Sequence, residues 1–170
     1  MRIAILGAAL ALAACGTERE PGPADAPQPS PATAPAPDEG TVLEELGEAD
    51  FAQAELAGEL GCSFRRDADA LAIWIGRGDV AGDAGAESMI KFGGAVRKLA
   101  MAGTGGYDAM ADGARFENGG VALAISKTDD EPLAEDPQIA MESPIHPATL
   151  TFAVTGEEER TVQGLLECGP

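Results

Sequence analysis

From residue 60 onward, apolar side chains recur at every second position in short runs that end at glycine-containing turns. The clearest runs are residues 150–154 and 162–168, with Gly156 and two glutamates between them. Because successive side chains of a β-strand point to opposite faces, each run has one apolar and one polar face. Two such runs joined by a short turn predict an antiparallel hairpin. No helical pattern of the βαβ kind alternates with the runs.

Earlier runs with the same period predict further strands. Asn118 and two glycines precede one of them and form a strong turn signal, since these residues accept positive φ at little cost. In another run, the alternation places Ile73 and Ile75 together with Leu71, with Trp74 on the opposite face. These runs cover residues 60–65, 71–75, 89–92, 95–99 and 121–126.

One short helix is expected at the start of the folded part, where Leu43, Leu46, Phe51 and Leu56 recur at loosely helical spacing. Glutamates lie between these apolar residues. The sequence therefore predicts a mainly β fold, a small antiparallel barrel or sandwich of about six or seven strands with one short N-terminal helix.

Composition restricts both the core and the partners. Aromatic residues make up only 4% of the chain, so the core must rely on aliphatic side chains. The chain has 29 acidic and 11 basic residues, a formal net charge of −18. Such a charge disfavours nucleic acid and anionic membrane surfaces and attracts a basic partner. The same acidity can also serve solubility alone, so charge leaves the partner open.

The N-terminus has the three parts of a secretory signal, with cationic Arg2, an apolar stretch and small residues before Cys15. Its last residues, Leu12-Ala13-Ala14-Cys15, resemble the lipobox of bacterial lipoproteins. The resemblance implies a signal peptide at 1–14, acylation of Cys15 and a lipid anchor in the cell envelope. Gly16, where aspartate would retain a lipoprotein at the inner membrane, favours the outer membrane facing the periplasm. The alternatives are an ordinary signal peptide cleaved nearby or an apolar cytoplasmic tail.

A tether is expected between the lipid and the folded part. Residues 16–41 contain seven prolines and five alanines with almost no large apolar side chain. Such a composition cannot bury enough surface to offset chain entropy, which predicts disorder. At about 3.1 Å per residue, the stretch could reach on the order of 80 Å. The expected organisation is a lipidated Cys15 and tether at 15–41, followed by a single β-rich domain at 42–170.

With Cys15 assigned to lipid by the lipobox resemblance, Cys62 and Cys168 remain, in a compartment that favours oxidation. We expect them to form a structural disulfide. Each lies on the apolar face of its predicted strand, which makes the strands and the bond mutually consistent. The chain lacks a Cys-x-x-Cys motif, which favours a structural rather than a redox role.

A second resemblance covers a short part of the chain, where a Gly-containing turn is followed one strand later by Lys127. The segment is similar to the inhibitor family of c-type lysozymes, which are small disulfide-closed β-barrels with a Ser-Gly-x-x-Tyr segment and a Lys-Gly segment. Gly113 and Lys127 match, whereas Asp112 replaces the serine, Phe116 the tyrosine and Thr128 the glycine. The resemblance implies that Lys127 pairs with the catalytic carboxylates of lysozyme. The candidate partner-binding residues are Asp112, Gly113, Arg115, Phe116 and Lys127.

Other candidate chemistry is sparse. His146 is the only histidine, is expected in a proline-rich loop and lacks partners at metal-ligand spacing. An acidic segment within residues 128–147 carries Asp129, Asp130, Glu131, Glu135 and Asp136, whose spacing is not that of an EF-hand. So many carboxylates in one segment can bind calcium, and a solvated loop is the favoured alternative. We expect no metal, no cofactor and no catalytic residue.

Taken together, the sequence favours a lipid-anchored envelope protein that is a non-catalytic binding or structural module. The alternative is a lysozyme-inhibitor-like protein that binds a basic, envelope-degrading enzyme. A basic periplasmic protein is the expected partner of either binding function. An enzyme is the weakest hypothesis, since only scattered carboxylates support it.

Overall fold

The computed structural model describes residues 41–133 and 143–170. The expected signal peptide, Cys15 and nearly all of the tether lie outside the described residues, as do Glu135 and Asp136 of the acidic segment. Within the described ranges, no helix is long and apolar enough to cross a membrane.

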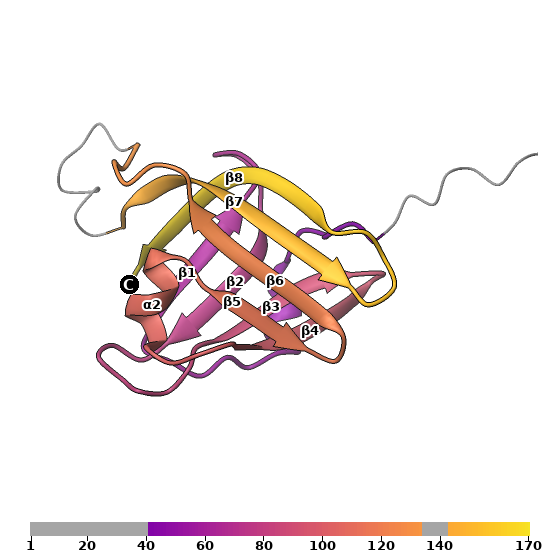
Figure 1. The fold of residues 1–170 in the computed structure, drawn as a ribbon, viewed down its shortest axis with the longest axis horizontal. Coiled ribbons are helices and arrows are strands. Elements are labelled where there is room, and N and C mark those ends of the chain that lie inside the picture. Colours follow the sequence, from indigo (N-terminus) through magenta and orange to yellow (C-terminus); the bar gives the residue numbers. More distant parts are fainter. Residues whose placement is uncertain (1–40, 134–142) are drawn as a thin grey trace, which may run out of the picture. The chain divides into compact units, whose positions relative to one another are not determined.

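Eight strands form a closed barrel in which each strand pairs antiparallel with the next along the chain (Figure 1). The last strand pairs with the first, so neither is left as a free edge. Among the described residues, two short helices accompany the barrel, one before the first strand and one between the fourth and fifth. The elements are α1 (Glu48–Phe51), β1 (Leu60–Arg65), β2 (Ala72–Gly78), β3 (Glu87–Phe92), β4 (Ala95–Met101), α2 (Gly106–Asp112), β5 (Arg115–Asn118), β6 (Val121–Lys127), β7 (Ile145–Val154) and β8 (Arg160–Gly169).

Side chains fill the inside of the barrel, as is usual for closed barrels of this strand number. The ring centroids of Trp74 and Phe116 lie 5.4 Å apart in a tilted arrangement. A Cβ on Gly76 would approach the Met110 sulfur to 2.5 Å and the Trp74 ring to 2.7 Å, so this position accepts no side chain. Met110 of α2 therefore packs into one end of the barrel. Other large core residues are Phe64, Ile90, Leu99, Leu123, Ile125, Leu150, Phe152 and Leu166.

The predicted disulfide is confirmed and joins the first and last strands. Cys62 of β1 lies directly opposite Cys168 of β8, with their Cα atoms 4.1 Å apart. The bond closes the barrel covalently at the same place where the hydrogen-bonded ladder closes it. Both cysteines are buried on the inner face, as the alternation predicted.

The mainly β, antiparallel prediction is confirmed, and of the two expected architectures the barrel is present. The expected strand number was too low. β5 has only four residues, of which only Phe116 is buried, so alternation gives almost no signal there. Helix α2 was not predicted, because it begins at the second glycine of the Gly105-Gly106 pair and buries only Gly106 and Met110.

The expected N-terminal helix is present but shorter than its apolar pattern indicated, and the assignment of the two faces of β2 was wrong. The N-terminal helix is confined to Glu48–Phe51, and Leu43 and Leu46 before it are buried without being helical. In β2, Trp74 points into the barrel, Ile75 packs on the outside, and Leu71 precedes the strand and is 56% exposed. Both faces of β2 are covered, so alternation alone could not indicate which face is inner.

The outer cover of β2 is the segment 41–59, called the strap from here on. Its backbone bonds to two strands, from the Glu44 N–H to the Lys91 carbonyl and from the Leu46 N–H to the Ala72 carbonyl, both at 2.8 Å. Beneath it lies a second, smaller core on the outside of the barrel. This outer core consists of Leu46, Ala54 and Met89, with Leu56, Ile75 and Val96 packed around them.

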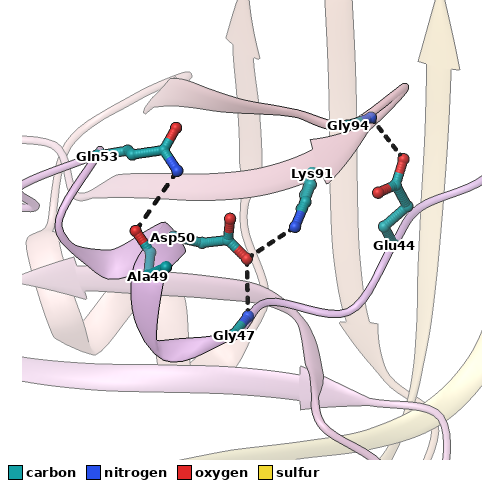
Figure 2. A network of polar contacts seen from close by, with 7 residues as sticks. All are labelled: Glu44, Gly47, Ala49, Asp50, Gln53, Lys91 and Gly94. Carbon is teal, nitrogen blue, oxygen red and sulfur yellow. Dashed lines mark hydrogen bonds and ion pairs between the residues drawn. The ribbon is translucent and has the colours of Figure 1, made fainter.

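Polar contacts fasten the strap to the β3–β4 hairpin (Figure 2). One Asp50 carboxylate oxygen accepts hydrogen bonds from the Gly47 N–H at 2.8 Å and from the Lys91 ammonium at 3.0 Å. The Glu44 carboxylate accepts a hydrogen bond from the Gly94 N–H at 2.8 Å, in the turn of that hairpin. Apolar burial and charged hydrogen bonds therefore hold the strap against the barrel.

The two ends of the barrel differ. One end, called the turn end, carries the tight turns after β3, β5 and β7. The other, called the α2 end, carries α2, the start of β5 and the end of β6 (Figure 1). Thr41 binds the Glu157 carboxylate in the β7–β8 turn, through its N–H at 2.9 Å and its hydroxyl at 2.7 Å. The strap therefore starts at the turn end, opposite the α2 end.

Candidate functional site

The structure brings the candidate residues Asp112, Gly113, Arg115 and Lys127 together at the α2 end. Asp112 ends α2, Arg115 begins β5, and Lys127 ends β6. The β5–β6 hairpin pairs Arg115 with Ala124, so Lys127 extends beyond the start of β5. The Lys127 ammonium lies 3.3 Å from the Asp112 carboxylate. The Asp112 side chain is 84% exposed, whereas the Lys127 side chain is only 18% exposed.

Gly113 fixes the turn between α2 and β5. Its φ of 109° lies in a region that favours glycine, and a Cβ there would come within 2.8 Å of the Ile125 carbonyl oxygen. The Gly113 N–H bonds to the Met110 carbonyl at 3.1 Å, and the Ile125 N–H bonds to the Ala114 carbonyl at 2.9 Å. These contacts hold the Asp112 and Lys127 backbones in a fixed relation.

Arg115 and Phe116 point to opposite sides of β5. Arg115 is exposed, and its guanidinium makes no hydrogen bond or ion pair to the residues that the structure describes. Phe116 is only 1% exposed and packs on Trp74, so it belongs to the core and offers no surface to a partner. Gly113, Arg115 and Ser126 line a shallow hollow of about 300 Å³ beside α2.

Asp129, Asp130 and Glu131, the described acidic residues of the acidic segment, follow Lys127 at the α2 end, as does His146. The sequence favoured a loop position for His146, but this residue is the second of strand β7. Its Nδ1 lies 3.2 Å from the Asp129 carbonyl oxygen. The Asp129 carboxylate accepts a hydrogen bond from the Glu131 N–H at 2.9 Å, which forms a local turn over these three residues. In the described part of the chain, no three His, Cys, Asp or Glu side chains are grouped as a metal site.

The carboxyl groups with shifted pKa values lie on the strap contacts instead of at the α2 end. Hydrogen bonds from the Gly47 N–H and then Lys91 lower the pKa of Asp50. The Ala57 N–H and then Lys98 lower the pKa of Glu87. The Thr41 hydroxyl and N–H lower the pKa of Glu157. Each ionised carboxylate therefore helps to bind the strap.

Comparisons with known proteins do not assign this geometry to a family. The chain matches no family model, no curated protein and no solved structure. The site must therefore be judged from its own residues. Sequence reasoning brought Asp112, Gly113, Arg115 and Lys127 forward, but it did not identify the strap or its contacts, because Leu43, Leu46 and Leu56 had been interpreted as part of a helix.

Proposed function

We propose that the chain is a lipid-anchored protein of the cell envelope, at the outer membrane and facing the periplasm, that binds another protein without catalysis. The binding surface is the α2 end, around Asp112, Arg115 and Lys127. The observation that carries the proposal is the grouping of these charged side chains at the end of the barrel opposite Thr41.

Charge supports a basic protein as the partner. The chain carries a net charge of −18, which would speed the encounter with a basic protein by long-range attraction. Within this acidic surface, Arg115 and Lys127 supply cations that can pair with carboxylates of the partner. Asp112 already holds the Lys127 ammonium, so a partner carboxylate would have to replace or join it.

A lysozyme-inhibitor-like activity is the more specific form of this proposal. It is supported by Gly113 and Lys127, the residues that match the inhibitor family of c-type lysozymes, and by the small disulfide-closed barrel on which they lie. In this form, Lys127 would pair with the catalytic carboxylates of the enzyme. Since Phe116 is buried, the side chains next to Lys127 in the contact would be Asp112 and Arg115.

The test is a pull-down of envelope proteins on the full chain with its disulfide intact, followed by a titration of each captured protein. A specific partner should bind in a saturable manner with a fixed stoichiometry. Lys127→Ala and Arg115→Ala should each weaken it, because one cationic contact is removed.

Arg160→Ala is the matched control, since Arg160 begins β8 at the turn end and lies far along the barrel from Lys127. This variant should leave the affinity unchanged. Capture that responds equally to all three substitutions would indicate general charge attraction. That result, or no saturable partner at all, would contradict the proposal and favour a structural envelope component.

A further inference from the structure

A larger groove lies between the strap and the outer faces of β1 and β2, apart from the candidate residues at the α2 end. Its volume is about 840 Å³. One wall is the strap, from Phe51 to Glu59, and the floor includes Ser63 of β1 and Ile75 of β2. Gly61 widens the floor, because it has no side chain on the outward face of its strand.

Several apolar side chains that line the groove are exposed or only partly buried. Phe51, at the end of α1, is 43% exposed although α1 begins beside the buried outer core. Leu56 and Ile75 line the groove and are only partly buried. An exposed aromatic ring next to aliphatic side chains is typical of a binding surface.

The charges around the groove favour a cationic occupant. Glu55 and Glu59 are exposed on the strap wall, and neither forms an ion pair with the residues that the structure describes. Arg77 is the cation that lines the groove, and its guanidinium donates a hydrogen bond to the Glu59 carbonyl at 3.2 Å. The Glu167 carboxylate is neutralised by Arg65 at 2.6 Å. The Lys98 ammonium, beside the groove, donates to the Glu55 backbone carbonyl at 2.8 Å and pairs with the Glu87 carboxylate at 2.7 Å. The carboxylates of Glu55 and Glu59 therefore remain available to an occupant.

We propose that this groove is a second binding site, which takes a short peptide segment of a partner protein that carries apolar side chains beside basic ones. The apolar side chains lie on Phe51, Leu56 and Ile75, and the basic ones pair with Glu55 and Glu59. The strap forms the wall of the site, so the site exists only while the strap is docked. The proposal does not depend on the function assigned to the α2 end, because the two sites share no residue.

The probe is a blocked tetrapeptide, Lys-Phe-Leu-Lys, titrated into the full chain while backbone amide shifts are followed by NMR. A salt concentration near 0.15 M limits long-range attraction, since the Debye length is then about 8 Å. Saturable shifts are expected at the amides of Gly61, Ser63 and Ile75. The neutral analogue Gln-Phe-Leu-Gln should bind about fivefold more weakly, as expected for the loss of exposed ion pairs.

Matched variants locate the site. Ser63→Trp fills the groove and should remove the saturable shifts, whereas Thr149→Trp, also an outward strand position bearing a hydroxyl, should not. The double variant Glu55→Gln/Glu59→Gln should make the two peptides bind equally. Its control is Glu158→Gln/Glu159→Gln, which changes the net charge by the same amount at the turn end.

Three results would overturn the proposal. They are the absence of saturable shifts in the groove, equal binding of the cationic and neutral peptides to the original chain, and equal weakening by the two pairs of glutamate substitutions. Retention of the remaining amide spectrum shows that each variant is folded. Lys127→Ala should leave peptide binding unchanged, which separates this site from the α2 end.

Discussion

Removal of the Cys62–Cys168 bond should destabilise the barrel strongly without opening it. The cysteines are 106 residues apart in the sequence, and a loop of that length corresponds to about 4.8 kcal/mol of denatured-state entropy at 25 °C. Because native bonds seldom deliver the full amount, the double variant C62A/C168A should lose about 3–5 kcal/mol of its free energy of unfolding. Alanine is the suitable replacement, since both side chains are buried and serine would place a hydroxyl in the core.

The assay is urea unfolding of the full chain, followed by the fluorescence of Trp74, the single tryptophan. The midpoint of thermal unfolding should fall by roughly 10–25 °C. The urea m-value should rise, because the denatured chain becomes more expanded without the cross-link. A loss below about 1 kcal/mol would refute the entropic argument. Loss of the native fluorescence without denaturant would show that strand pairing alone does not close the barrel.

Three further perturbations have directions set by the structure. Acid should loosen the strap, because folding lowers the pKa values of Asp50, Glu87 and Glu157. Their contribution to the free energy of unfolding is fully present above the pKa values of the unfolded chain, near about 4. It is lost as the pH falls through the lower pKa values of the folded chain. Hydrogen exchange of strap amides between about pH 5 and 2 should show early release, and uniform exchange along the chain would argue against it. Phe116→Ala should cost about 3–5 kcal/mol in urea unfolding, since it empties a core position beside Trp74, and a cost below 1 kcal/mol would exclude that packing. Gly113→Ala should cost about 1–2 kcal/mol or more, because a positive φ and a close carbonyl both oppose a Cβ, and an unchanged melting temperature would contradict this geometry.

The strands that could be predicted are those with one buried and one open face. β6, β7 and β8 alternate cleanly because the barrel interior covers one face and solvent the other. β2 has apolar residues on both faces, since the strap covers its outer side. Its inner face could not be assigned from period alone, and Trp74 was placed on the wrong side.

The candidate site was partly predictable for a topological reason. The sequence predicted a turn at Asn118 and the strand after it, and the hairpin that this turn joins brings the residues at the start of β5 close to Lys127. The Asp112–Lys127 ion pair and the burial of Phe116 depend on α2 and on barrel closure, which have no local signal. The groove was not predictable, because its wall is an irregular segment that packs on strands distant in the sequence.

The most direct test of the account is the binding of a purified, basic c-type lysozyme to the full chain, measured together with its activity. The account predicts saturable binding to the α2 end, which Lys127→Ala weakens and Arg160→Ala does not, and a loss of activity if the inhibitor-like form is correct. Saturable binding with full enzyme activity would retain a protein-binding α2 end and remove only the inhibitor-like form. Absence of site-dependent binding, for lysozyme and for every protein captured from the envelope, would contradict the central claim.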